Sequence, residues 1–172
     1  MRKYIKQLLA LSLAVIAVIS FTGCGTRTAT IPEENKVKVS EMAEDATGVE
    51  AICKTLKEKE YVSDDCIKTN AELIGAKSGY RFDGVSVNGS KFSLEIYEYA
   101  DTESDTANKI ISSVKENNSF NLFGKTVSYS YMSDNGKYLL IYPDSKSVSD
   151  KADDNENVKR KNEVMEIINS AE

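Results

Sequence analysis

The chain has 172 residues and a formal net charge of −5, from 22 Lys and Arg against 27 Asp and Glu, and it contains neither histidine nor tryptophan. The absence of histidine excludes Ser-His-Asp and Cys-His catalysis and zinc sites built on imidazole. The acidic balance, without a basic patch interleaved with aromatic residues, argues against nucleic-acid binding, because phosphates repel a negatively charged surface.

The first residues have the layout of an export signal. Three basic residues, at positions 2, 3 and 6, precede an apolar run from Leu8 to Ile19, and small residues follow at Thr22 and Gly23. The run has about a dozen residues, whereas a helix that spans a bilayer core of about 30 Å needs about 20. We therefore expect a cleaved signal peptide over residues 1–23 and no permanent transmembrane helix.

Phe21-Thr22-Gly23-Cys24 resembles the lipobox, the cleavage motif of bacterial lipoprotein precursors. The resemblance implies that the thiol of Cys24 receives a diacylglyceryl group and that a signal peptidase cuts between Gly23 and Cys24. It further implies a mature protein, similar to other small exported lipoproteins, that is held at the cell membrane and faces away from the cytoplasm. Two acyl chains give lasting attachment, since each buried CH₂ contributes about 0.8 kcal/mol.

The mature chain would be more acidic than the precursor and would keep two cysteines beyond the lipidated one. Cleavage removes three basic residues and no acidic one, which leaves 19 basic against 27 acidic residues and a net charge of −8. Cys53 and Cys66 are a candidate disulfide, because even pairs of cysteines in exported domains are commonly bridged. The alternative is a pair of buried free thiols.

The chain after Cys24 is expected to begin with a tether followed by two helices. Residues 24–40 contain the lipidated cysteine and a polar, Thr-rich stretch without a period, which indicates a flexible tether. Residues 41–60 place Val49, Ile52, Cys53 and Leu56 on one helical face. Ser63-Asp64-Asp65 is typical of a helix N-cap, and a second helix is predicted to end near Lys77, before Ser78-Gly79.

The next segments alternate between strand and helix patterns. Asn88-Gly89 predicts a hairpin within residues 80–99, and Thr102 to Asp105 is typical of a capping box before a third helix. Residues 126–132 and 138–142 predict a second hairpin around Asn135-Gly136. A final helix is predicted from about Asn155.

These elements predict one α+β domain over residues 41–172 with the order ααββαββα. We expect a four-stranded antiparallel sheet, made from the two hairpins, with helices packed on one face.

Three motifs are reminiscent of catalytic or ion-binding sites. Ser112-x-x-Lys115 and Ser133-Asp134-Asn135 match the S-x-x-K and S-D-N motifs of the penicillin-binding enzymes. The third motif of these enzymes, K-T-G, is replaced by Lys125-Thr126-Val127, which comes before S-D-N in the chain instead of after it. Gly124-Lys125-Thr126 lacks the first glycine of a Walker A loop and precedes a strand pattern. The acids between 101 and 105 lack the glycine and the glutamate of a calcium loop. We interpret the residues from Ser133 to Gly136 as a hairpin turn and the acids as helix-capping residues.

Four tyrosines form a candidate binding surface. Tyr97 and Tyr99 share one face of a predicted strand, as do Tyr129 and Tyr131. Exposed together on an open sheet face, they would suit a glycan or protein partner. The alternative is that the rings pack beneath helices.

We expect a membrane-anchored, non-catalytic binding module with an envelope protein or a glycan as partner, and with no cofactor or metal. The alternative is a small hydrolase that works without histidine, through carboxylates or the Ser112 and Lys115 pair.

Overall fold

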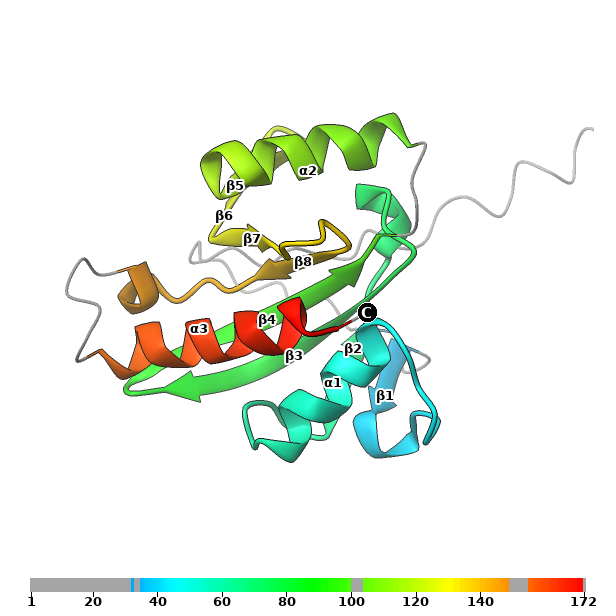
Figure 1. The fold of residues 1–172 in the computed structure, drawn as a ribbon, viewed down its shortest axis with the longest axis vertical. Helices are drawn as coiled ribbons and strands as arrows, with labels where there is room; N and C mark the ends of the chain where they lie inside the picture. The colour runs from blue at the N-terminus through cyan, green and yellow to red at the C-terminus, as the bar shows by residue number, and fades with distance from the viewer. Residues whose placement is uncertain (1–31, 33–34, 100–103, 149–154, 172) are drawn as a thin grey trace, which may run out of the picture. The chain divides into compact units, whose positions relative to one another are not determined.

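The computed structural model describes residues 32, 35–99, 104–148 and 155–171, and within them the chain forms three α-helices and eight strands (Figure 1). The predicted signal peptide, Cys24 and residues 25–31 of the predicted tether lie outside these ranges. The helices are α1 (Val49–Glu58), α2 (Asp105–Asn117) and α3 (Glu156–Asn169). The strands are β1 (Lys36–Lys38), β2 (Asp65–Lys68), β3 (Ser78–Val87), β4 (Ser90–Glu98), β5 (Ser119–Leu122), β6 (Lys125–Ser128), β7 (Ser130–Met132) and β8 (Tyr138–Ile141).

The α+β class is confirmed, but the predicted four-stranded sheet is wrong. The main sheet has six antiparallel strands in the order β1-β2-β3-β4-β8-β7, and β5 and β6 form a separate two-stranded hairpin. The two additional strands of the main sheet, β1 and β2, come from segments that were not predicted to be strands. β1 lies within the predicted tether, and β2 lies within the predicted second helix.

The second predicted helix is replaced by β2 and a short 3₁₀ turn, η3 (Ala71–Ile74). Asp64 does not cap a helix here. Its carboxylate instead accepts hydrogen bonds from the backbone N–H of Ser40 at 2.9 Å and from the Ser40 hydroxyl at 2.7 Å, and it pairs with Lys57 at 2.9 Å. The hydrogen bonds from Lys57 and Ser40 lower the pKa of Asp64 to about 2. These contacts hold the segment beside β1.

Helices cover both faces of the sheet, which corrects the prediction that they pack on one face. One buried cluster joins α1 and α3 to residues that include Phe82, Leu94 and Leu140. The other joins α2, η3 and the β5–β6 hairpin to Tyr97, Leu139 and other residues of the opposite face. All four residues of β8 are buried, as expected for a strand between two apolar layers.

Both predicted hairpin turns are present, and the first has the conformation that its sequence indicates. Asn88 and Gly89 have φ values of 40° and 76°, and a type I′ turn requires positive φ at both positions. In the second turn, the N–H of Gly136 donates to the carbonyl oxygen of Ser133 at 2.9 Å. The predicted strand over residues 126–132 is divided at Tyr129, where φ is 59°. Its first half, β6, pairs with β5 instead of with β8.

The third and fourth predicted helices are confirmed as α2 and α3. The Ser104 hydroxyl accepts a hydrogen bond from the Ala107 N–H, and the Asn155 side chain accepts one from the Asn157 N–H, so both helices have side-chain N-caps. The cap of α2 is thus Ser104 and not Thr102, the first residue of the predicted capping box, which lies outside the described residues. Asn118 ends α2 in the left-handed conformation with φ of 50°.

The N-terminus of α1 is capped from the sheet. Glu98, at the end of β4, accepts hydrogen bonds from the Val49 N–H at 3.0 Å and from Lys77 Nζ at 2.7 Å. Burial alone would raise the pKa of Glu98, but these hydrogen bonds outweigh it and leave the pKa below its usual value. The ionised carboxylate therefore lies at the positive end of the α1 dipole.

Candidate functional site

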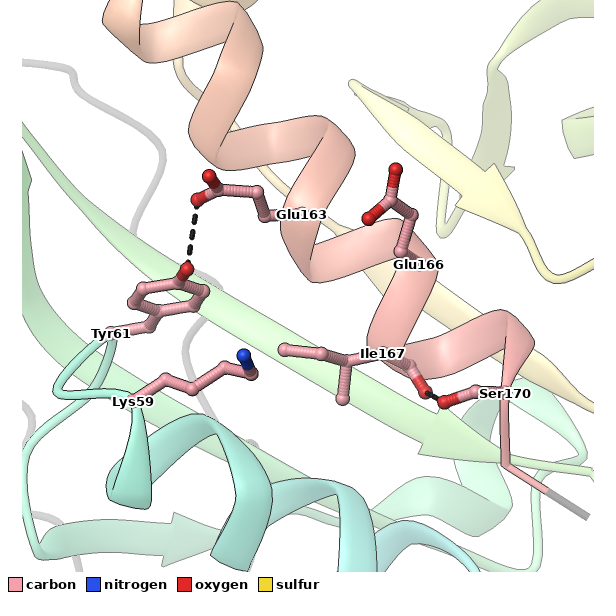
Figure 2. Close-up of a pocket in the computed structure, with 6 residues that line it drawn as sticks. All are labelled: Lys59, Tyr61, Glu163, Glu166, Ile167 and Ser170. Atoms are coloured by element: carbon pink, nitrogen blue, oxygen red, sulfur yellow. Dashed lines mark hydrogen bonds between the residues drawn. The ribbon is translucent and has the colours of Figure 1, made fainter.

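An open depression of about 400 Å³ lies between the C-terminal end of α1 and the exposed side of α3 (Figure 2). Glu60, with φ of 59°, turns the chain after α1, and the Tyr61 N–H bonds back to the carbonyl oxygen of Leu56 at 2.9 Å. The lining residues are Lys59, Tyr61, Glu163, Glu166, Ile167 and Ser170.

Two of the polar groups that line this depression bond to other residues of its wall. The Tyr61 hydroxyl donates to Glu163 Oε2 at 2.8 Å, and the Ser170 hydroxyl donates to the Ile167 carbonyl oxygen at 2.8 Å. The Arg160 guanidinium carbon lies 3.9 Å from the centroid of the Tyr61 ring, and its Nε lies 3.4 Å from Glu163 Oε2. The hydrogen bond to Glu163 raises the pKa of Tyr61, so the phenol stays protonated.

The depression is better suited to joining α1 to α3 than to catalysis. Its serine hydroxyl donates to the carbonyl oxygen of Ile167, and in the described part of the chain it has no hydrogen bond to a carboxylate or amine that could activate it as a nucleophile. Across the described ranges, no three Cys, Asp or Glu side chains gather in a way that could hold a metal ion. We therefore place the candidate interaction site elsewhere.

The β5–β6 hairpin presents Phe123 at its tip with 78% of its surface exposed. Phe123 and Gly124 have φ values of 50° and 78°, and the Gly124 N–H donates to the Asn121 side-chain oxygen at 2.9 Å. A left-handed conformation costs an ordinary L-residue about 1–2 kcal/mol. Asn88-Gly89 forms the same kind of turn in this chain with asparagine in place of phenylalanine. Phe123 thus stabilises neither its turn nor the core.

The turn at Phe123 was not predicted, although the sequence contains a signal for it. The Phe123-Gly124 pair lies between two short segments with inward apolar residues: Phe120 and Val127 are buried, and Leu122 is partly buried against the same cluster. A glycine between such segments indicates a two-residue hairpin, but the phenylalanine before it is atypical.

The four predicted tyrosines do not form an exposed surface, which corrects that prediction. Tyr97 and Tyr99 are 8% and 3% exposed in the cluster that contains α2. Tyr131 is half-buried against the other cluster, with Lys161 Nζ 5.2 Å from its ring centroid. Tyr129 is half-buried at the break between β6 and β7. Because both sheet faces are covered, Tyr97 and Tyr99 become part of the core.

The two predicted disulfide residues are both buried and unbridged, Cys53 on α1 and Cys66 on β2. They belong to one cluster with Tyr80, whose hydroxyl donates to Glu50 Oε1 at 2.6 Å. Burial raises the pKa of Cys53 well above its usual range and that of Cys66 to about 11.

The residues named for the hydrolase alternative lie on α2 and in the second hairpin turn. Ser112 and Lys115 are exposed on α2, and Lys115 Nζ lies 3.4 Å from the position that a Cβ would take at Gly136. The Ser133 hydroxyl donates to the Asn135 side-chain oxygen at 2.6 Å within the hairpin turn, and this confirms the interpretation of residues 133–136 as a turn.

Comparison with known proteins gives no relative: no protein-family model, no curated protein and no solved structure matches this chain. Of the helices in the described part of the chain, none has both the length and the apolarity to cross a bilayer. The function must therefore be inferred from the residues of this chain.

Proposed function

We propose that this chain is the precursor of an exported lipoprotein that is held at the outer face of a membrane through Cys24 and acts there as a non-catalytic interaction module. The basic start, the short apolar run and Phe21-Thr22-Gly23-Cys24 support the anchor. β1 begins twelve residues after Cys24, so the domain would lie within about 40 Å of the anchor, at about 3.3 Å per residue.

The observation that carries the interaction role is the exposed phenylalanine at the strained tip of the β5–β6 hairpin. A strained residue with most of its side chain exposed contributes little to stability, and this favours a role outside the fold. We propose that the Phe123 ring enters an apolar pocket of an envelope protein, in the manner of aromatic residues that dominate binding energy. The hairpin contacts β7, which is one edge strand of the main sheet, whereas the chain from Cys24 enters the domain at β1, the other edge strand. This separation favours a protein partner over the anchoring membrane as the binding target of Phe123.

The anchor is tested by replacing Cys24 with serine in the full-length chain. Wild-type protein is expected to incorporate labelled palmitate and to fractionate with membranes, whereas Cys24→Ser incorporates none because it lacks the acceptor thiol. Cys53→Ser serves as the matched control and should keep the label. Wild-type protein that retains residues 1–22 and an unmodified Cys24 thiol in its intact mass would contradict the anchor.

The interaction role predicts that Phe123→Asn stabilises the fold and removes binding. Asparagine tolerates positive φ, so we expect the free energy of unfolding in urea to rise by about 1 kcal/mol. In cells, a photo-reactive amino acid at the exposed position 125 should cross-link wild-type protein to a protein of discrete mass. The same adduct should disappear with Phe123→Asn.

The matched control is Leu73→Asn, at another exposed apolar residue, which should leave the adduct unchanged. Cross-linking to lipid alone would assign the tip to the membrane surface and contradict the protein partner. An adduct that persists in Phe123→Asn would show that the ring does not make the contact.

A further inference from the structure

An Asn-Gly pair occupies each hairpin turn that joins neighbouring strands of the main sheet, and the structure holds the two pairs differently. Asn88-Gly89 joins β3 to β4, and Asn135-Gly136 lies between β7 and β8. In such a pair the backbone nitrogen of the glycine can attack the side-chain amide of the asparagine, because no Cβ on the glycine hinders the approach. Two chemically identical pairs can therefore be compared within one chain.

The second pair is held at both of its reacting groups. Asn135 Oδ1 accepts hydrogen bonds from the Ser133 hydroxyl at 2.6 Å and from the Lys137 N–H at 2.9 Å. Asn135 Nδ2 donates to the carbonyl oxygen of Ala171 at 3.2 Å. The Gly136 N–H, which would be the attacking group, donates to the Ser133 carbonyl oxygen at 2.9 Å. Ring closure at this pair requires these hydrogen bonds to break.

The first pair is exposed, and its reacting groups are not held in this way. Within the described ranges, neither the Asn88 side chain nor the Gly89 N–H has a hydrogen-bond partner. The hydrogen bond of this peptide group is at the Asn88 carbonyl oxygen, which accepts from Lys146 Nζ at 3.1 Å. The same Nζ lies 3.4 Å from the position that a Cβ would take at Gly89.

Lys146 is positioned beside this turn by its own backbone. It lies in the short 3₁₀ turn η4 (Ser145–Val148). Its N–H donates to Asp144 Oδ1 at 3.0 Å, and its carbonyl oxygen accepts from Asn155 Nδ2 at 2.9 Å. The ammonium thus contacts the oxygen of the peptide group whose nitrogen would attack. When that nitrogen loses its proton, the negative charge spreads onto the oxygen, and a neighbouring positive charge favours this charged form.

We propose that Asn88 is a site of spontaneous deamidation and that the ammonium of Lys146 promotes the reaction. The Gly89 nitrogen loses its proton and forms a bond to the side-chain amide carbon of Asn88. The bond from that carbon to the amide nitrogen breaks, and the nitrogen takes up a proton and leaves as ammonia. Water then opens the resulting succinimide at either carbonyl, which gives aspartate or isoaspartate at position 88.

Isoaspartate would alter the hairpin more than aspartate would, because the main chain then runs through the side-chain carbon and the turn gains a methylene. The turn places Val87 opposite Ser90. Asn157 Nδ2, in the first turn of α3, donates to the Val87 carbonyl oxygen at 2.9 Å and to the Ser90 hydroxyl at 3.2 Å. The isoaspartate form should therefore hold α3 less firmly and unfold at a lower urea concentration than the aspartate form.

The test follows both asparagines in the purified full-length chain, kept folded in detergent at neutral pH for several weeks. Samples are digested, and peptide mass spectrometry detects the replacement of the side-chain NH₂ by OH. We expect Asn88 to be lost at least about tenfold faster than Asn135, because the hydrogen bonds at Asn135 must break first. In urea, where those hydrogen bonds are absent, the two rates should become similar.

The contribution of Lys146 is measured with Lys146→Met, which keeps the backbone contacts of η4 and removes the ammonium. Loss of Asn88 should slow by about threefold or more, and Lys146→Arg, which keeps the charge, should restore the rate. The matched control is Lys91→Met, at another exposed lysine of the same hairpin, which should leave the rate unchanged.

Equal rates at the two asparagines in the folded protein, or no loss at Asn88 while the chain in urea reacts, would overturn the assignment of the site. A rate at Asn88 that is the same in wild-type protein and in Lys146→Met would overturn the role of the ammonium.

Discussion

Replacement of Asp144 with alanine is expected to lower the free energy of unfolding by about 4 kcal/mol, because it removes the acceptor at the centre of a buried polar network. Asp144 is 2% exposed. Its Oδ1 accepts from the Ser90 hydroxyl at 2.8 Å and from the Lys146 N–H at 3.0 Å. Its Oδ2 accepts from Asn157 Nδ2 at 2.7 Å.

The cost comes from the donors that lose their partner. Hydrogen bonds to a charged group contribute about 1.5–3 kcal/mol each, and a buried donor without an acceptor costs about 1–3 kcal/mol. Asn157 Nδ2 also donates to the Val87 carbonyl oxygen at 2.9 Å, so the network joins the first turn of α3 to the end of β3. Its loss would loosen α3 where it meets the β3–β4 hairpin.

Urea unfolding of the variant at neutral pH measures this effect. The matched control is Asp134→Ala, at an exposed aspartate in the second hairpin turn, with an expected change within about 0.5 kcal/mol. Asp144→Asn keeps the volume of the side chain and should lose about half as much as alanine. A loss below about 1 kcal/mol in Asp144→Ala would mean that water satisfies the three donors and that the network contributes little.

Local signals in the sequence predicted the turns and the capped helices. Asn88-Gly89 has the positive φ values that its residue types favour, and Ser104 and Asn155 cap helices that begin where the polar residues precede an apolar stripe. In each case a side chain of the segment satisfies the backbone of the same segment. Such interactions can be predicted from neighbouring residues alone.

The arrangement of the sheet could not be predicted in this way, because it depends on distant partners. β2 is a strand since β1 and β3 flank it, and Asp64 bonds to Ser40, which is 24 residues away. The uninterrupted apolar run Tyr138–Ile141 did carry a usable signal. A strand with four consecutive buried residues must lie between two layers, which would have predicted helices on both faces of the sheet.

The candidate site likewise depended on distant contacts that the local sequence does not reveal. The alternation of side chains along β4 correctly predicted that Tyr97 and Tyr99, just past the end of the strand, lie on the same side of the sheet. The alternation does not reveal whether a helix covers that side. Phe123 could be recognised only once its backbone conformation and its exposure were known together. Neither property follows from residue type.

Replacement of Gly79 with alanine is expected to lower the free energy of unfolding by about 3 kcal/mol, for a purely steric reason. Gly79 is paired with Tyr97 across β3 and β4, and the Tyr97 ring covers it. A Cβ at Gly79 would lie 2.7 Å from Cε1 of Tyr97 and 2.7 Å from Thr69 Oγ1, with another ring atom closer still. The ring is held in the α2 cluster and has little room to move.

A double-mutant cycle attributes that loss to the ring. Truncation in Tyr97→Ala is itself costly, by about 3–5 kcal/mol. In that background Gly79→Ala should cost no more than about 1 kcal/mol, because only the Thr69 hydroxyl still meets the new Cβ and alanine in a strand loses less chain entropy than glycine. The matched control is Gly124→Ala, where a Cβ meets no atom within 4 Å and only the positive φ opposes the change. It should cost about 1 kcal/mol. An equal loss from Gly79→Ala with and without the Tyr97 ring would show that the ring is not what requires glycine there.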